Sequence, residues 1–163
     1  MKSPRILRRV LALALSLAGT VWAQRTVTVE IDGNQITGTG TASIMLASQG
    51  DENALGFSVT FNPAVLRYED FKAGADTAGA TINLNAARAA EGRLGLAIAV
   101  AAGSSFRAGG RQLVVLRFTV LAEAASEAIG FGDSPIRREI AGVTAHELTA
   151  TYHPAAIATR RSK

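Results

Sequence analysis

Large apolar and small residues alternate along segment 54–61, which reads ALGFSVTF. In an extended chain one side carries the apolar set: Leu55, Phe57, Val59 and Phe61. The other side carries the small set: Ala54, Gly56, Ser58 and Thr60. The first set is typical of a strand that packs one face on a core. The second is unusual, because an exposed strand face normally carries longer polar side chains.

Eight further segments have the short apolar runs of strands and are separated by turns rich in Gly, Pro, Asn, Asp and Ser. With the first they form the set 25–31, 41–47, 54–61, 66–71, 80–85, 93–100, 111–120, 127–131 and 148–158. Short strands at regular spacing predict an all-β sandwich or barrel. Two Ala-rich stretches, 85–92 and 122–128, are long enough only for single helical turns.

The parity of each strand predicts the core. It assigns to the interior Leu55, Phe57, Val59, Phe61, Ile82, Leu84, Leu94, Leu96, Ile98, Val100, Val114, Leu116, Phe118, Val120, Ile129 and Phe131. In segment 111–120 the same parity turns four residues outward: Arg111, Leu113, Val115 and Arg117. This apolar set is large enough to hold two sheets together.

The first 23 residues have the pattern of a secretory signal peptide. A basic start is followed by the short apolar run VLALALSLAGTV and by small residues at Val21 and Ala23. We therefore expect a signal peptide at 1–23, one domain at 24–159 and a basic tail at 160–163. The mature protein is expected to be extracellular or periplasmic, with no membrane attachment after cleavage.

Removal of that peptide changes the charge balance. Four of the 17 Lys and Arg residues lie in it, which leaves 13 against 13 Asp and Glu. A nucleic-acid partner needs a basic patch with interleaved aromatic residues, and the mature sequence has none. The chain has no cysteine, so its stability must come from packing or from a partner.

Residue patterns of catalysis or metal binding are not found in the sequence. The two histidines, His146 and His153, have no cysteine to complete a zinc site, and HEL at 146–148 lacks the second histidine of a metalloprotease helix. The adjacent carboxylates Asp51–Glu52 and Glu69–Asp70 are better interpreted as solvated charge than as a glycosidase pair. We expect a non-catalytic protein with no cofactor and no metal site.

Two motifs resemble those of cohesin domains. The first, GFSVTFNPAVLRYEDF, is an alternating strand that ends in an Asn-Pro turn and is followed by a second strand. The second, FRAGGRQLVVLRFTV, is a Gly-rich loop that leads into a long strand. The resemblance covers residues 25–158, nearly the whole mature chain.

The resemblance implies a nine-stranded jelly-roll β-sandwich that binds a protein partner, a dockerin-like module, in polysaccharide degradation or at a cell surface. In cohesins the partner binds the outer face of a sheet whose strands correspond here to 127–131, 54–61, 93–100 and 80–85. The residues expected on that face are Gly56, Ser58, Thr60, Thr81, Asn83, Asn85, Gly95, Ala97, Ala99, Ala128 and Gly130. We expect one open, smooth surface, with Asn83 and Asn85 as its hydrogen-bonding groups and Asp133 at its end.

Three other interpretations stay open at this stage. In an Ala-rich chain, small residues on a surface are also consistent with compositional filler. A carbohydrate-binding module shares the architecture, but it normally needs exposed aromatic rings, and only four remain outside the predicted core: Tyr68, Phe71, Phe106 and Tyr152. A structural subunit of a surface or secretion assembly is the third.

Overall fold

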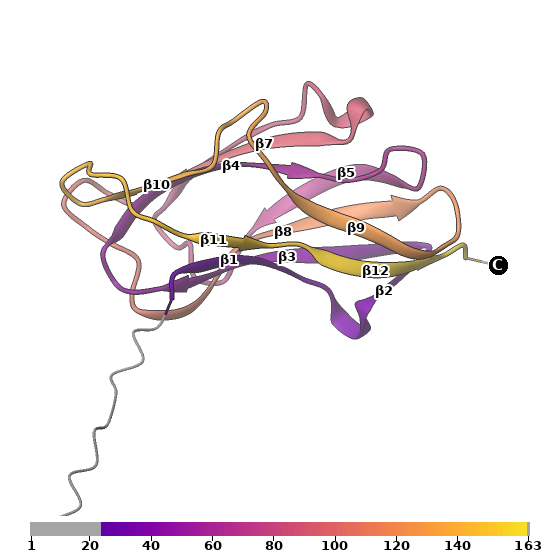
Figure 1. Cartoon of the computed structure of the whole chain (residues 1–163), viewed down its shortest axis with the longest axis horizontal. Coiled ribbons are helices and arrows are strands. Elements are labelled where there is room, and N and C mark those ends of the chain that lie inside the picture. Colours follow the sequence, from indigo (N-terminus) through magenta and orange to yellow (C-terminus); the bar gives the residue numbers. More distant parts are fainter. Residues whose placement is uncertain (1–23, 163) are drawn as a thin grey trace, which may run out of the picture.

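The computed structural model describes residues 24–162 (Figure 1). The predicted signal peptide and Lys163 lie outside the described residues. The strands are β1 (Thr26–Glu30), β2 (Gln35–Thr37), β3 (Thr39–Ser48), β4 (Glu52–Thr60), β5 (Leu66–Ala73), β6 (Thr81–Asn85), β7 (Arg93–Ala99), β8 (Gly109–Val120), β9 (Ala124–Gly132), β10 (Glu139–Gly142), β11 (Thr151–His153) and β12 (Ala155–Arg160). Two single turns of 3-10 helix complete the list, η1 (Asp32–Asn34) and η2 (Ala89–Glu91). Over these residues no helix is long and apolar enough to cross a bilayer.

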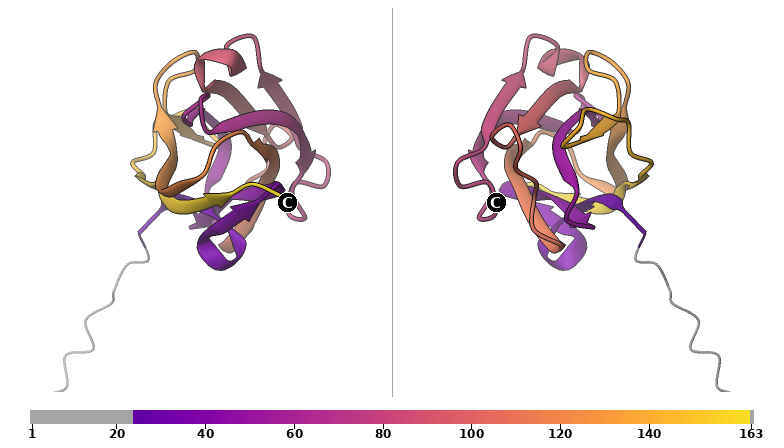
Figure 2. Two further views of the ribbon diagram at one scale, coloured as in Figure 1. Left: turned by 90° about the vertical axis from the view of Figure 1, so that its right-hand side faces the viewer. Right: turned by 90° about the vertical axis from the view of Figure 1, so that its left-hand side faces the viewer.

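The strands form two sheets, which confirms the prediction of an all-β sandwich. One sheet has the order β11-β1-β3-β8-β5. The other has the order β2-β12-β9-β4-β7-β6, and β10 pairs with β4 beside that path. Viewed along the long axis in Figure 2, the two sheets curve around a common interior.

The chain crosses between the sheets at two short connections. Gly38, with φ +62°, joins β2 in one sheet to β3 in the other. Pro154 joins β11 to β12 in the same way. Segment 148–158 was predicted as one strand, which is wrong, because a proline has no N–H for a ladder and here marks the change of sheet.

Further differences from the predicted strands are local. Strands β2 and β10 were not predicted, and residues 124–127 extend β9 where a helical turn was considered. The other candidate turn, 85–92, contains η2. Strand β12 extends into the predicted basic tail, because Arg160 pairs with Thr37 of β2.

The interior between the sheets contains most of the predicted core. Phe57 and Phe118 are fully buried, and edge-to-face ring contacts join Phe57 to Phe131 and Phe61 to Phe118. The outward assignment of Leu113 is wrong, since this residue is fully buried. The register of β8 against β3 shifts between Ile44 and Met45, so a β-bulge turns Leu113 to the same side as Val114.

A buried ion pair lies at the start of the described chain, so the interpretation of Glu52 as solvated charge is wrong. Arg25 is 6% exposed and its Nε lies 2.5 Å from Oε1 of Glu52, which is 0% exposed. Ser48 and the backbone N–H groups of Gln49 and Gly50 also donate to this carboxylate. Burial alone would raise the pKa of Glu52, but these hydrogen bonds and the guanidinium outweigh it and lower the pKa to about 2.

This carboxylate should make the fold sensitive to acid. A folded-state pKa below the unfolded value stabilises the fold above about pH 4.5, and the stabilisation is lost as pH falls toward 2. We expect the free energy of unfolding to fall by about 3 kcal/mol across that window from this group. Urea denaturation of the protein and of a Glu52→Gln variant at several pH values measures it. Equal slopes with pH in the two proteins would contradict the assignment.

Candidate functional site

Strand β4 is the centre of the sheet that the resemblance singles out. Along one edge it pairs with β7, and β7 pairs with β6. Its other edge pairs with β9 near one end and with β10 near the other. The neighbour order β9-β4-β7-β6 agrees with the order implied by the resemblance, and it brings Gly56, Ala97 and Asn83 side by side across three strands.

The chain leaves this sheet between β9 and β10 and packs back on its outer face. Ser58 is fully buried beneath this segment. Its Oγ donates to the Ile136 carbonyl at 2.7 Å and accepts from the Ile136 N–H at 2.8 Å. A Cβ on Gly95 would lie 2.9 Å from side-chain atoms of both Pro135 and Ile136. Segment 133–138, called here the covering loop, therefore occupies the middle of the face.

The two ends of the covering loop are tied together and to the core. Asp133 accepts from the backbone N–H and the guanidinium of Arg138, which hold the pKa of Asp133 well below its usual range. The Arg138 guanidinium lies 5.5 Å from the ring centre of Tyr152, which packs on Phe131. Burial raises the pKa of Tyr152 to about 12, and within residues 24–162 its hydroxyl has no hydrogen-bond partner. Asp133 thus fixes the loop.

The prediction of one continuous open face is therefore wrong. Ser58 and Gly95 lie beneath the covering loop, and Gly130 is buried beside Pro154 and Thr60. Small residues at these positions let another part of the same chain approach closely. The remaining predicted residues fall into two groups on either side of the covered centre.

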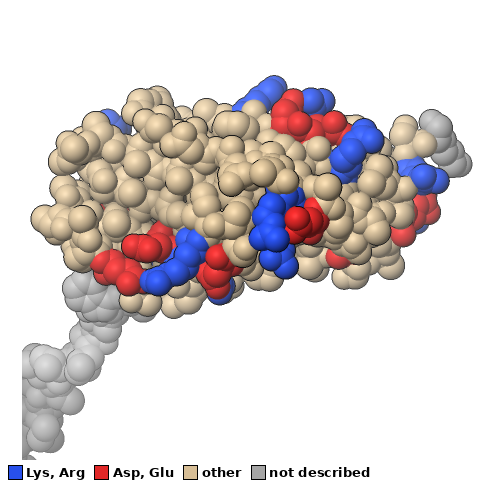
Figure 3. All heavy atoms as spheres, turned by 90° about the horizontal axis from the view of Figure 1, so that it is seen from above, with Lys and Arg blue, Asp and Glu red and all other residues tan. Residues whose placement is uncertain are grey.

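The first group lines an open groove beside the covering loop, with a volume of about 320 Å³. Its walls are Ala54, Leu55, Gly56, Thr81, Asn83, Ala97, Ile98, Ala99, Ile136, Arg137, Glu139 and Ala141. Five of the predicted residues are among them: Gly56, Thr81, Asn83, Ala97 and Ala99. Figure 3 views the molecule from this side and shows a broad uncharged area bordered by acidic and basic side chains.

The second group lies toward the other end of the sheet. Thr60 shares a small recess with Arg93, Gly132, Asp133 and Ser134. Asn85 is exposed and accepts from the Ala87 N–H at 3.0 Å, an Asx turn that closes β6. Ala128 is exposed and pairs with Ala156 of β12. None of these three lines the groove.

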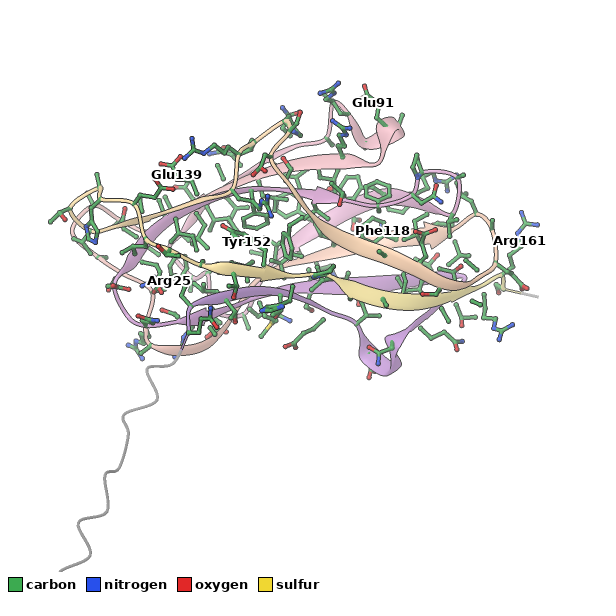
Figure 4. The ribbon with its side chains drawn as sticks, in the orientation of Figure 1. Arg25, Glu91, Phe118, Glu139, Tyr152 and Arg161 are labelled. Atoms are coloured by element: carbon green, nitrogen blue, oxygen red, sulfur yellow. The ribbon has the colours of Figure 1, made fainter. Side chains whose placement is uncertain are left out.

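The charges at the rim of the groove come from β10 and the covering loop. Arg137 lies 3.5 Å from Glu147, and both side chains are about two-thirds exposed. Glu139 is exposed on β10, and over residues 24–162 it has no side-chain hydrogen bond or ion pair (Figure 4). The groove therefore combines an apolar floor, the polar Asn83 on one side and a free carboxylate on the other.

Sequence reasoning missed the covering loop and its Ile136. The segment FGDSP was predicted as a turn, with Asp133 at the end of the binding face. The available signal was a set of small residues on two neighbouring strands, Gly56 and Ser58 on β4 and Gly95 on β7, together with a Pro-Ile dipeptide in a loop. An apolar side chain in a turn needs a place to pack, and glycines on a sheet supply one.

The side chains that would serve the other interpretations are dispersed. Phe106 is 3% exposed, Tyr68 packs on Phe118 and Tyr152 packs on Phe131, so these rings do not form a platform for a sugar. His146 contacts Thr144 and His153 contacts Thr151. In the part of the chain that the structure describes, no three His, Cys, Asp or Glu side chains gather into a metal site.

Comparison with solved structures finds cohesin modules. A non-cellulosomal cohesin from Archaeoglobus fulgidus is 14% identical in sequence and superposes with a TM-score of 0.66. The match covers 84% of this chain and 91% of that cohesin. The cohesin module of a family 33 glycoside hydrolase from Clostridium perfringens is 8% identical with a TM-score of 0.70, and the match covers 85% of this chain and 98% of that module. A type II cohesin from Acetivibrio cellulolyticus, in complex with an X-dockerin, is 13% identical with a TM-score of 0.66, and the match covers 84% of this chain and 100% of that cohesin.

The chain has the fold of cohesin modules. No protein-family model and no curated protein sequence matches it significantly. The likeness thus lies mainly in the path of the chain, at a low sequence identity.

Proposed function

We propose that this protein is a non-catalytic recognition module that binds a dockerin-like protein partner in the groove between β6, β7, β4 and β10. The observation that carries the proposal is that groove, which lies on the outer face of the sheet β9-β4-β7-β6 and is open beside the covering loop. The similar cohesin of Acetivibrio cellulolyticus, which forms a complex with a dockerin, supports this class of partner.

The composition of the groove suits protein recognition. Ala97 and Ala99 have no rotamers to order on binding, so a helix or strand can approach closely at low entropic cost. Ile136 supplies an apolar wall, and Asn83 and Thr81 supply donors and acceptors. Glu139 favours a partner with a basic side chain next to its apolar contact.

We also propose that the protein works outside the cytoplasm, in polysaccharide degradation or at a cell surface. The support is the predicted signal peptide at 1–23 and the type of module to which the fold is similar. N-terminal sequencing of the exported protein tests this, and the expected first residue is Gln24.

Replacement of Ala97 by arginine should strongly weaken partner binding and leave the fold intact. Ala97 lies between Gly56 and Asn83 at the centre of the groove, is half-buried and has no charged neighbour in register. An arginine there fills the groove, and we expect the affinity to fall by at least about 30-fold. Biolayer interferometry against purified type I and type II dockerin modules measures the affinity, and thermal melting measures the fold.

The matched control is Ala47→Arg, an exposed alanine on β3 of the other sheet. It should bind as the unmodified chain does. Undiminished binding by the Ala97→Arg variant would remove the groove from the proposal. Binding to no dockerin module by the unmodified chain would remove the partner class.

A further inference from the structure

Strand β6 ends its sheet without any of the usual protection. It is the last strand in the order that runs to β7, so its far edge pairs with no strand in residues 24–162. Its sequence, TINLN, contains no charged residue and no proline, and its register with β7 has no bulge. Such an edge presents free N–H and C=O groups that can pair with another strand.

The other strands that end the two sheets are protected. Strand β5 carries four charged residues, Arg67, Glu69, Asp70 and Lys72, and a bulge between Tyr68 and Asp70. Strands β2 and β11 have only three residues each. Charges, bulges and short length are the devices by which natural sheets avoid pairing at their edges. Their absence from β6 therefore distinguishes its edge from those of β5, β2 and β11.

The polarity of β6 is symmetric about its central residue. Thr81, Asn83 and Asn85 are exposed on the outer face, and Ile82 and Leu84 are half-buried on the inner face. If two copies align antiparallel about Asn83, Ile82 lies opposite Leu84, and Asn83 lies opposite its own copy. Each side chain then faces one of its own kind, as a two-fold interface requires.

We propose that β6 is a self-association edge, through which two copies of this chain pair antiparallel about Asn83 into a continuous sheet across a two-fold axis. The pairing satisfies the free edge of both copies and covers Ile82 and Leu84 further. It places the two grooves on the same face of the joined sheet. The proposal does not depend on what the groove binds.

The interface is small, so the dimer should be weak. A pair of five-residue strands belongs to the class of interfaces below about 1,200 Å², which are transient. Sedimentation equilibrium of the purified protein from about 10 μM to about 1 mM should show a twofold rise in weight-average mass. Asn83→Lys places two like charges opposite each other and should keep the chain monomeric. Gln35→Lys, an exposed amide at the other edge of the same sheet, should dimerise normally.

Cysteine cross-linking tests the register itself, because the chain has no cysteine. Residues directly opposite in an antiparallel pair have Cα atoms about 4.5–5.5 Å apart, within the range of a disulfide. Under mild oxidation Asn83→Cys should therefore form a covalent dimer. Thr81→Cys should not, because its own copy lies four residues away along the strand, about 13 Å. The double variant Thr81→Cys/Asn85→Cys should cross-link again.

Two results would overturn the proposal. One is a monomer at every concentration with no cross-link at Cys-substituted Asn83. The other is a dimer that Asn83→Lys does not affect, or that cross-links equally through the variants at Thr81 and Asn83.

Discussion

Replacement of Arg25 by alanine is expected to lower the free energy of unfolding by about 3–5 kcal/mol. The arginine is almost fully buried, and its guanidinium donates to Glu52, Asp51 and the Thr149 carbonyl. Without it, Glu52 stays buried as an anion that only Ser48 and backbone N–H groups partner. The cost is mainly that of an unpaired buried charge, which is larger than the net value of the pair.

The matched control is Arg67→Ala. Arg67 pairs with Glu69 at 2.9 Å, but its side chain is 60% exposed, so we expect less than about 1 kcal/mol. Urea denaturation at neutral pH compares the two variants. Equal losses would show that the Arg25 cluster has no special role. A loss in Arg25→Ala that disappears in Arg25→Ala/Glu52→Gln would confirm that the uncompensated carboxylate is the cause.

The parts of the fold that sequence predicts are those that a single strand determines. The alternation in 54–61 and 93–100 needs only the two-residue period of an extended chain, and Phe57, Val59, Leu94 and Leu96 are buried as that period requires. The pairing of the sheet came from the resemblance, and the observed order agrees with it.

The parts that sequence did not predict depend on a second strand. Leu113 has outward parity within 111–120 and is buried only because a bulge against β3 shifts it. Strand β10 is four residues long and exists through its pairing with β4. Neither the bulge nor the pairing leaves a periodic signal in its own segment.

The small residues on the outer face of β4 and β7 have two different explanations. At Ser58 and Gly95 the small side chain makes room for Pro135 and Ile136 of the same chain. At Ala97 and Ala99, no segment among residues 24–162 covers the half-buried side chains, which line the groove. A small residue on a strand therefore predicts that another segment packs closely on it. Whether that segment is a loop of the same chain or a partner depends on contacts with residues about 40 to 80 positions away in the sequence, which the strand itself does not reveal.

Replacement of Gly92 by alanine should also be strongly destabilising, by about 3 kcal/mol. Gly92 has φ +74°, a left-handed conformation that costs an alanine about 1–2 kcal/mol. In addition, a Cβ there would lie 2.0 Å from the Phe61 carbonyl oxygen, which is backbone and cannot rotate away. Gly92 ends η2 and its carbonyl accepts from the Phe61 N–H at 3.0 Å, so relief of the clash must disturb the start of β7.

Gly79→Ala separates the two causes, because Gly79 has φ +79° but, apart from its chain neighbours, no atom of residues 24–162 lies within 4 Å of the added Cβ. It should cost only the conformational strain, about 1–2 kcal/mol. The difference between the two variants in chemical denaturation then measures the contact with Phe61. That contact matters for the groove, since Gly92 precedes the pairing of Arg93 with Thr60 that sets β7 against β4. We therefore expect Gly92→Ala to weaken binding in the groove as well, whereas equal stability of the two variants would show that β7 can shift freely.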